Sequence, residues 1–158
     1  MNSVAAVVVT YNRLDELKKN IEMLKLQTRS ADAIYIIDNA STDDTGVYLE
    51  ELTRLNENII HCRLEKNLGG AGGFSYGLER ACQDGYDWVW LMDDDGRPQD
   101  AQTLEKLMQV AENESNFSLI NCNVLWDGNE LSFKIGTQYN TLKEQQENIP
   151  SGLIENCA

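Results

Sequence analysis

Three adjacent carboxylates, Asp93, Asp94 and Asp95, directly follow the apolar run 88–92. Neighbouring negative charges repel one another, and burial would raise their pKa values unless a cation lies nearby. In extended backbone, Asp93 and Asp95 project to the same side and offer two oxygen ligands to Mg²⁺ or Mn²⁺. Such an ion usually keeps several waters and takes its other ligands from substrate phosphates. The alternative is a solvated acidic loop, which the following glycine, Gly96, favours.

A glycine-rich segment, Asn67-Leu68-Gly69-Gly70-Ala71-Gly72-Gly73, stands at the start of a predicted helix. Glycines let a ligand approach the backbone closely, and the free N–H groups at a helix start favour an anion. The segment matches neither the dinucleotide-binding GxGxxG pattern nor the P-loop pattern. A flexible turn is the alternative interpretation, so the glycines alone are a weak indication of a phosphate site.

The segment Thr10-Tyr11-Asn12-Arg13 contains an aromatic ring and a cation that suit a nucleotide. The ring of Tyr11 could stack on a base, and the Arg13 guanidinium could bind a phosphate. The alternative is an ordinary helix start, in which Asn12 caps the helix and Arg13 is solvated.

Asp38 and His61 are the remaining candidates for chemistry. The Asp38 carboxylate could accept a hydrogen bond from a base N–H or a ribose hydroxyl, or it could cap the following helix. His61 is the only histidine and lies within a strand pattern, so we interpret it as structural. This leaves no ordinary Ser-His or Cys-His nucleophile pair.

Alternating strand and helix patterns position these residues. Apolar runs predict strands at 4–10, 33–37, 59–64 and 88–92, with further strands near 117–124 and 131–135. Helical spacing predicts helices at 14–26, after residue 44, from the glycine segment to 81, and at 100–112. For the second helix we expect an inward face of Val47, Leu49, Leu52 and Leu55.

This alternation predicts an α/β fold with a mainly parallel sheet flanked by helices. Ligands of open parallel sheets bind beyond the carboxyl ends of the strands. The polar segments described above all follow predicted strands, so we expect them at one rim of the sheet.

Length and charge narrow the classes of partner. The chain has 158 residues and a net charge of −13, which fits one domain and disfavours nucleic acid or an anionic membrane surface. No apolar run approaches the ~18–20 residues of a membrane span. The four cysteines are far apart and contain no CxxC pair, which is typical of reduced thiols and predicts a cytoplasmic location.

The ordered segments VVVTYNR, IIDNASTDDT, NLGGAGG and WVWLMDDDGRP resemble the inverting nucleotide-sugar glycosyltransferases of family two, which have the Rossmann-like GT-A fold. The resemblance covers residues from about 4 to 125. Within the family, the glycine and DDDG motifs are similar to those of bacterial galactofuranosyl- and rhamnosyltransferases. The resemblance implies transfer, with inversion, from a UDP- or dTDP-sugar to a saccharide or lipid-linked saccharide acceptor in envelope polysaccharide synthesis.

By the same resemblance, a set of residues would bind the donor nucleotide: Thr10, Tyr11, Arg13, Asp38, Asn67, Gly69, Gly70, Asp93 and Asp94. Asp38 would read the base, usually uracil or thymine. Asp93 and Asp95 would hold Mn²⁺ or Mg²⁺.

The catalytic base is missing from this pattern. In the family it is a carboxylate of the acceptor-binding half, and no residue after Asp95 matches that acidic motif. We therefore expect residues 1–158 to be the donor-binding part, truncated before the acceptor half, with the general base beyond Ala158. One alternative is a non-catalytic nucleotide-sugar-binding module, and another is a Mg²⁺-dependent receiver or phosphatase-like α/β domain. The sequence leaves open whether the protein forms an oligomer.

Overall fold

The structure is a computed structural model that describes residues 2–113, 119–120, 122, 125–126 and 130–131. Four strands form the main sheet: β1 (Val4–Thr10), β2 (Ala33–Asp38), β3 (Ile59–Arg63) and β4 (Trp88–Asp93). The helices are α1 (Leu14–Lys25), α2 (Thr45–Leu55), α3 (Gly69–Gln83) and α4 (Thr103–Asn113). Two short antiparallel strands, β5 (Leu125–Trp126) and β6 (Glu130–Leu131), form a separate pair.

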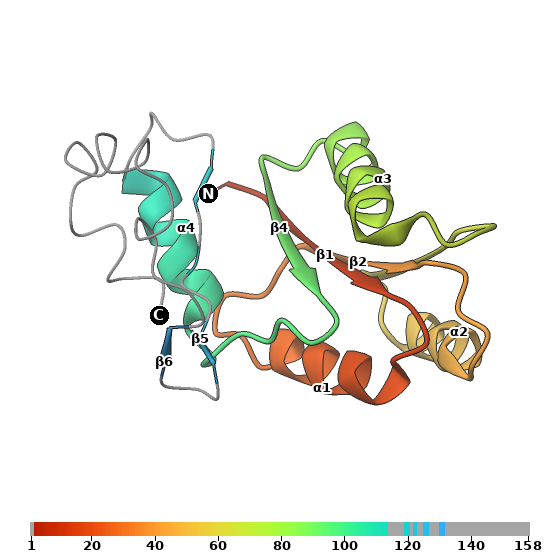
Figure 1. The fold of residues 1–158 in the computed structure, drawn as a ribbon. Helices are drawn as coiled ribbons and strands as arrows, with labels where there is room; N and C mark the ends of the chain where they lie inside the picture. Colours follow the sequence, from red (N-terminus) through yellow and green to blue (C-terminus); the bar gives the residue numbers. More distant parts are fainter. Residues whose placement is uncertain (1, 114–118, 121, 123–124, 127–129, 132–158) are drawn as a thin grey trace, which may run out of the picture.

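The main sheet is parallel, with strand order β3-β2-β1-β4 (Figure 1). In the register of its strands, Val8 of β1 lies beside Ile36 of β2 and Met92 of β4. Every residue of β1 is buried, as a continuous apolar run at the centre of a covered parallel sheet requires. The predicted α/β fold is confirmed.

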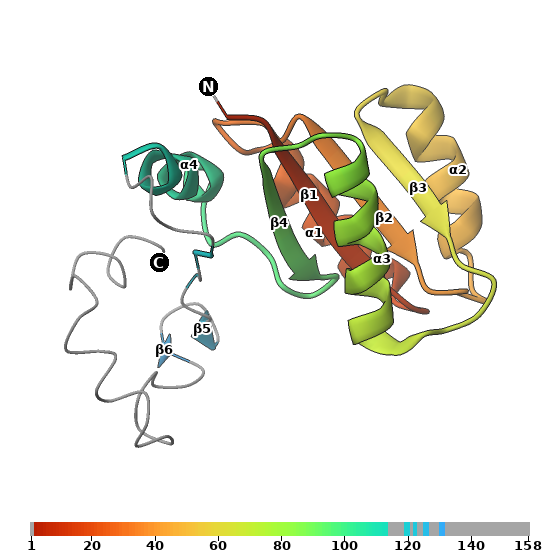
Figure 2. The same ribbon diagram turned by 90° about the horizontal axis from the view of Figure 1, so that it is seen from above.

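The two faces of the sheet carry different helices. Figure 2 shows α3 on one side of the sheet and α1 on the other, and Figure 1 places α2 on the same side as α1. Ala6 and Val8 belong to the core cluster that includes residues of α1 and α2, whereas Val7 and Val9 face α3. Because side chains alternate along a strand, Thr10 continues the row that faces α1 and α2.

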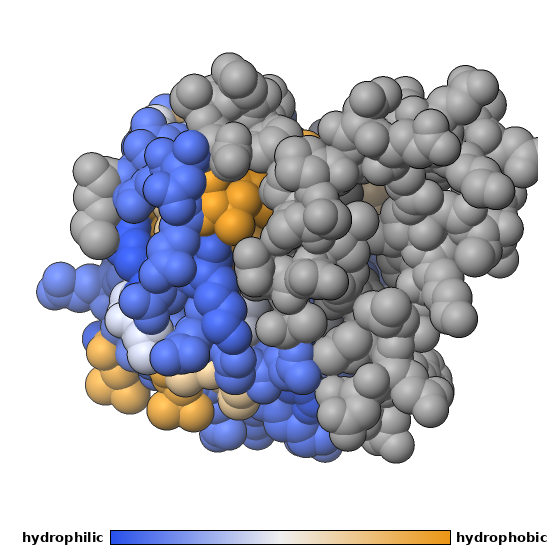
Figure 3. Space-filling view, turned by 90° about the vertical axis from the view of Figure 1, so that its left-hand side faces the viewer, coloured by the Kyte–Doolittle hydropathy of each residue, from blue (hydrophilic) through white to orange (hydrophobic). Residues whose placement is uncertain are grey.

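Helix α4 lies beyond the β4 edge of the sheet (Figure 2). Its Leu104 and Met108 join the core cluster on the α1 face. Gln27, just after α1, links that helix to the start of α4. Its Oε1 accepts from the Leu104 N–H (2.9 Å), and its Nε2 donates to the Asp100 carbonyl (2.8 Å). From the side that carries α4, the described residues show a mostly hydrophilic surface, with apolar atoms in the middle and at the lower left of the view (Figure 3). No helix among the described residues is long and apolar enough to cross a bilayer.

Some predicted details differ from the structure. The inward face of α2 is wrong at two positions, since the exposed fractions of Val47 and Leu55 are 63% and 83%. Helix α4 starts at Thr103, three residues later than predicted. Residues 119, 120 and 122 are not in a strand, and the rest of the predicted strand at 117–124 lies outside the described residues. The prediction for 131–135 also lies mostly outside them, although Leu131 belongs to β6.

Candidate functional site

The three aspartates lie in a turn at the carboxyl end of β4. The strand ends at Asp93, and the Gly96 N–H returns to the Asp93 carbonyl at 3.0 Å. The prediction of extended backbone from Asp93 to Asp95 is therefore wrong, because the chain turns after Asp93. The buried Asn20 of α1 holds this turn, since its Nδ2 donates to the carbonyls of Asp93 (3.2 Å) and Gly96 (3.3 Å).

Arg13 gathers two of the three carboxylates. Its Nη1 lies 3.2 Å from Asp94 Oδ1, and its Nη2 lies 2.9 Å from Asp95 Oδ2. The hydroxyl of the buried Thr10 donates to Asp94 Oδ2 at 2.8 Å. Arg13 is at the start of α1 and its side chain is 48% exposed, but it is paired with two carboxylates rather than only solvated. It connects the end of β1 to the end of β4.

The charges of this acidic turn are only partly compensated. Burial raises the pKa of Asp94, and the Thr10 hydrogen bond and Arg13 offset this only in part. Burial, and then the charge of Asp95, raise the pKa of Asp93, which Arg13 opposes. Asp94 and Asp95 in turn raise the pKa of Arg13, so the guanidinium stays charged. The site retains excess negative charge, which favours binding of a further cation.

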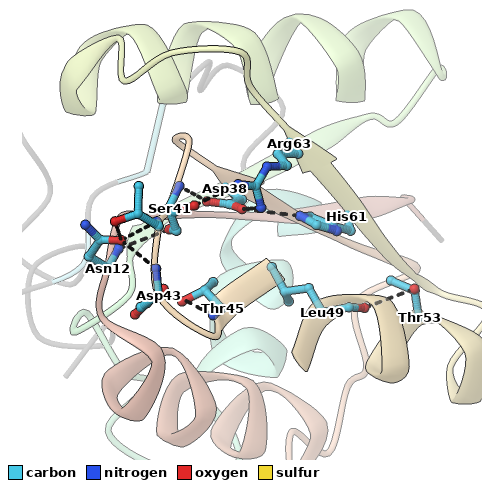
Figure 4. Close-up of polar contacts among 10 residues, drawn as sticks. Asn12, Asp38, Ser41, Asp43, Thr45, Leu49, Thr53, His61 and Arg63 are labelled. Atoms are coloured by element: carbon cyan, nitrogen blue, oxygen red, sulfur yellow. Dashed lines mark hydrogen bonds and ion pairs between the residues drawn. The ribbon is translucent and has the colours of Figure 1, made fainter. Parts of the chain in front are cut away.

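Asp38 is at the centre of a second network, at the end of β2 (Figure 4). Its Oδ1 accepts from the Ser41 N–H at 2.7 Å, and its Oδ2 accepts from Arg63 Nη1 at 3.2 Å. His61 Nε2 lies 3.6 Å from the same Oδ2. Burial works against the charged carboxylate, but His61, Ser41 and Arg63 outweigh it and lower the pKa of Asp38.

Asn12 joins the loop after β1 to the loop after β2. Its Oδ1 accepts from the N–H groups of Thr42 (2.7 Å) and Asp43 (3.3 Å), and its own N–H donates to Ser41 Oγ (3.0 Å). Asn12 adopts a left-handed conformation (φ 54°), which asparagine tolerates better than most residues. The predicted cap on α1 is wrong, because Arg13 occupies the cap position of that helix.

The glycine segment forms the start of α3 rather than a flexible turn. Gly69 has φ +72°, a conformation that favours glycine. The side chain of the buried Asn39 holds it, donating to the Gly69 carbonyl (3.0 Å) and accepting from the Leu68 N–H (2.8 Å). The Asn39 N–H also donates to the Thr10 carbonyl (2.9 Å). Asn39 therefore links the start of α3 to the ends of β1 and β2.

The structure brings most of the predicted site residues to one rim. Thr10, Arg13, Asp94 and Asp95 are in direct contact. Asn67 is on the exposed surface before α3, and its Oδ1 accepts from the Gly69 N–H at 2.7 Å. The remaining residues lie at the ends of these elements without a direct contact that connects them to the acidic turn in the described part of the chain: Tyr11 (exposed), Gly70 (exposed) and the buried Asp38.

Sequence reasoning missed several residues that hold this rim. Asn20, Asn39 and Arg63 were not among the candidate binding residues, although the side chain of each makes two hydrogen bonds there. Arg63 was detectable, because Ile59, His61 and Arg63 alternate on one face of a strand whose end reaches the rim. For Asn20 the only signal was a polar residue in an otherwise inward-facing row, whereas Asn39 directly follows the second predicted strand and so was expected at the rim.

A divalent cation fits the chemistry of the acidic turn. Among the described residues, no three or more His, Cys, Asp or Glu side chains are arranged as a metal cage. However, Mg²⁺ and Mn²⁺ in phosphate-binding sites need only one or two carboxylates besides water and phosphate oxygens. Asp93 and Asp95, which are close enough for the charge of one to raise the pKa of the other, are a donor set of this kind.

Comparisons with known proteins agree with this geometry. The sequence profile described as Glycosyl transferase family 2 matches residues 5–151. The chain is 43% identical over 124 residues to galactofuranosyltransferase GlfT1 of Mycobacterium tuberculosis (strain CDC 1551 / Oshkosh), covering 77% of this chain and 40% of that protein. It is 37% identical over 134 residues to GlfT1 of Mycolicibacterium smegmatis, covering 84% and 43%. The chain therefore spans about two fifths of the length of these relatives.

Two solved structures share the fold. S. aureus TarS in complex with UDP-GlcNAc has a TM-score of 0.69 at 21% identity, covering 83% of this chain and 37% of that one. The mannosyltransferase PcManGT of Pyrobaculum calidifontis, in complex with GDP-Man and Mn²⁺, has a TM-score of 0.61 at 17% identity, covering 79% and 36%. Together with the profile and the GlfT1 relatives, these likenesses exclude the receiver and phosphatase alternatives: the chain belongs to glycosyltransferase family 2 and has the GT-A fold.

Proposed function

We propose that this chain binds the nucleotide-sugar donor of an inverting glycosyltransferase that adds a sugar to an envelope saccharide. The observation that carries the proposal is the pairing of Arg13 with two aspartates. The Arg13 guanidinium, just after β1, holds both Asp94 and Asp95 at the carboxyl end of β4. Asn39 connects this rim to the amino end of α3, whose N–H groups suit a phosphate.

Each part of the rim would bind a different part of the donor. The exposed ring of Tyr11 would stack on the base, and Asn67, Gly69 and Gly70 would lie along the ribose and base. Arg13 would bind the diphosphate, since a guanidinium can turn from a carboxylate to a phosphate of similar geometry. Asp93 and Asp95 would hold Mn²⁺ or Mg²⁺. When bound, the ion would offset the negative charge that develops on the departing diphosphate.

We place the general base outside the rim formed by the carboxyl ends of the strands. Asp94 is engaged by Thr10 and Arg13, and Asp38 by Ser41 and Arg63, so both carboxylates already have partners within the protein. A base for an acceptor hydroxyl has to approach the sugar from the opposite face. We therefore propose that this part of the protein binds donor and by itself transfers little or no sugar. Its cytoplasmic location stays a prediction from cysteine spacing.

Calorimetric titration with UDP, dTDP and GDP, with and without Mn²⁺, tests donor binding. We expect tighter binding of UDP or dTDP in the presence of Mn²⁺, and loss of this metal dependence in Asp95→Ala. Asp44→Ala is the matched control, because this aspartate starts α2 and its side chain makes no cap hydrogen bond. Binding that ignores Mn²⁺, or no binding by the unmodified chain, would contradict the proposal.

A second measurement separates donor binding from catalysis. Incubation of the purified chain with radiolabelled UDP-sugar and a saccharide acceptor should yield little product above the background of the metal alone. Robust transfer would show that the base lies within these 158 residues. A chain that binds donor and shows no transfer even when the rest of the full-length protein is present would instead be a non-catalytic binding module.

A further inference from the structure

The carboxylate of Asp38 has no free side for a ligand. The exposed fraction of Asp38 is 0%. Oδ1 is taken by the Ser41 N–H at 2.7 Å, and Oδ2 is taken by Arg63 Nη1 at 3.2 Å. His61 covers Oδ2 from a further direction at 3.6 Å. A base that approached Asp38 from the rim would therefore meet other side chains first.

Arg63 is the most exposed of the three residues that contact the Asp38 carboxylate, since its side chain is 52% exposed, that of His61 is 13% exposed and Ser41 is buried. Arg63 is the last residue of β3, and its backbone pairs directly with Asp38 in the parallel sheet. Paired positions of adjacent strands project to the same face, so the two side chains meet there. Figure 4 shows Arg63 and His61 directed at Asp38 from β3, with Ser41 and Asn12 on the other side of the carboxylate.

The guanidinium of Arg63 is held in a defined place. Besides the bond to Asp38, its Nη2 donates to the Ser41 carbonyl at 2.8 Å. Gly46 of α2 leaves room for it, because a Cβ at that position would lie 2.4 Å from Arg63 Nη1. Because two hydrogen bonds already fix its side chain, Arg63 would lose less conformational entropy on binding a ligand than a free arginine would.

The Arg63 guanidinium has N–H donors besides those that bind Asp38 and Ser41. Arginine carries five N–H donors, of which two are used by Asp38 and Ser41. The Arg63 side chain is 52% exposed. Because Asp38 already balances its charge, the group best suited to it is a neutral acceptor, such as the carbonyl oxygen of a pyrimidine.

We propose that Arg63, positioned by Asp38, is the residue that contacts the base of the nucleotide, a proposal that rests on the function proposed above. Asp38 then acts as a positioning residue rather than as the direct reader of the base. In this arrangement Arg63 donates hydrogen bonds to the carbonyl oxygens of uracil. Asp38 does not accept a hydrogen bond from the uracil N3–H. Uracil is favoured over cytosine, whose amino group replaces one of these carbonyls with a donor.

A modified nucleotide tests this without changing the protein. Methylation of uracil at N3 removes the N3–H and leaves both carbonyl oxygens. We expect UDP and N3-methyl-UDP to bind the full chain, in the presence of Mn²⁺, with dissociation constants within about threefold of each other, since no hydrogen bond to N3 is lost. A loss of tenfold or more on methylation would show that Asp38 accepts from N3–H directly and would overturn the proposal.

Variants supply the second half of the test. Arg63→Ala should weaken UDP binding about tenfold, the value of one hydrogen bond to a charged group, and should abolish the preference for UDP over CDP. Arg63→Lys, which keeps the charge and protects the buried carboxylate, should lose the preference for UDP with a smaller loss of affinity. Arg54→Ala, which removes an exposed arginine of α2, is the matched control and should bind as the unmodified chain does.

The outcomes separate this proposal from the proposed function. If the unmodified chain binds UDP and both Arg63 variants retain its affinity and its preference over CDP, Arg63 does not contact the base and only this inference fails. If the unmodified chain binds none of UDP, dTDP and GDP, the donor-binding function fails together with it. Circular dichroism of each variant confirms that a loss of binding is not a loss of fold.

Discussion

The ionised state of Asp38 contributes to stability only while its hydrogen-bond donors are in place. Its pKa is lower in the folded protein than the ordinary aspartate value, despite complete burial. An acid with a lowered folded-state pKa stabilises the fold above its unfolded pKa, and this stabilisation is lost as pH falls through the folded value. The sign follows from proton uptake: the unfolded chain binds the proton first.

Asp38→Asn should lower the free energy of unfolding by about 1.5–3 kcal/mol at pH 7, because it breaks a charged hydrogen bond to Arg63. The difference from the unmodified chain should shrink below about pH 4, where unfolded aspartates become protonated. Urea denaturation at a series of pH values measures both quantities. A difference that stays constant down to pH 3 would show that the charge of Asp38 is not the cause.

The buried hydroxyl of Thr10 is the only neutral group that we find donating to the Asp94 side chain among the described residues. Thr10→Val keeps the shape of the side chain and removes this donor. We expect a loss of about 1–3 kcal/mol, since a buried carboxylate oxygen is left without a partner. Thr53→Val is the control, because that hydroxyl bonds only carbonyls of its own helix, and it should change stability by no more than about 0.5 kcal/mol. Equal losses in the two variants would contradict the importance of the Asp94 contact.

At the scale of elements, α3 lies unusually close to the sheet because glycines face it. A Cβ on Gly77 would lie 2.4 Å from Val7 Cγ1 and 3.0 Å from Ile37 Cγ1, and a Cβ on Gly73 would lie 2.6 Å from Val9 Cγ1. Part of the glycine-rich composition of this segment therefore serves packing on the sheet. The close packing places the amino end of α3 near the ends of β1 and β2.

Gly77→Ala should destabilise the protein even though alanine is the better helix former. Overpacking against Val7 and Ile37 costs about 1–3 kcal/mol, which exceeds the gain of about 1 kcal/mol in helix propensity. Gly70→Ala has nothing within 4 Å of the added carbon and should leave stability unchanged or raise it by up to about 1 kcal/mol. Thermal unfolding of the two variants distinguishes them, and an increase in stability for Gly77→Ala would contradict the close approach of α3.

For helix α2, periodicity predicted the helix but not which of its apolar residues are buried. Its existence was predicted correctly, but two of the four residues assigned to its inward face are exposed. At about 100° per residue, Val47 points away from the buried Leu49, whereas Leu55 is only about 60° from the partly buried Leu52 and is exposed as the last residue of the helix. All four are apolar, and only the position of α2 on β2 and β3 selects between them.

At the scale of the whole molecule, the net charge of −13 is a source of self-repulsion. The acidic turn adds to it locally, since Arg13 is shared between two carboxylates. Repulsion between exposed charges weakens as the Debye length shortens from about 30 Å at 0.01 M salt to about 8 Å at 0.15 M. Ionic strength should therefore influence the stability of this chain.

We expect the melting temperature to rise by about 2–4 °C between 0.01 and 0.15 M NaCl, which corresponds to about 1 kcal/mol for a chain of this size. Tetramethylammonium chloride should have the same effect, because screening does not depend on the identity of the cation. A constant or falling melting temperature would show that the positive groups already compensate the acidic surface. A rise with Mn²⁺ at far lower concentration, absent in Asp95→Ala, would report binding at the acidic turn instead.

The order of strands and helices along the chain, the parallel sheet, the family and the rim where most candidate residues gather all followed from the residues in chain order, because apolar periodicity and strand-end motifs are local. The pairings at that rim did not. Thr10 and Asp94 are 84 positions apart, and Arg63 and Asp38 are 25 apart. Such contacts depend on strand order and register, which place β4 beside β1 and Arg63 beside Asp38. The bend after Asp93 likewise depends on Asn20 of α1, a hydrogen-bond donor supplied from a distant part of the chain.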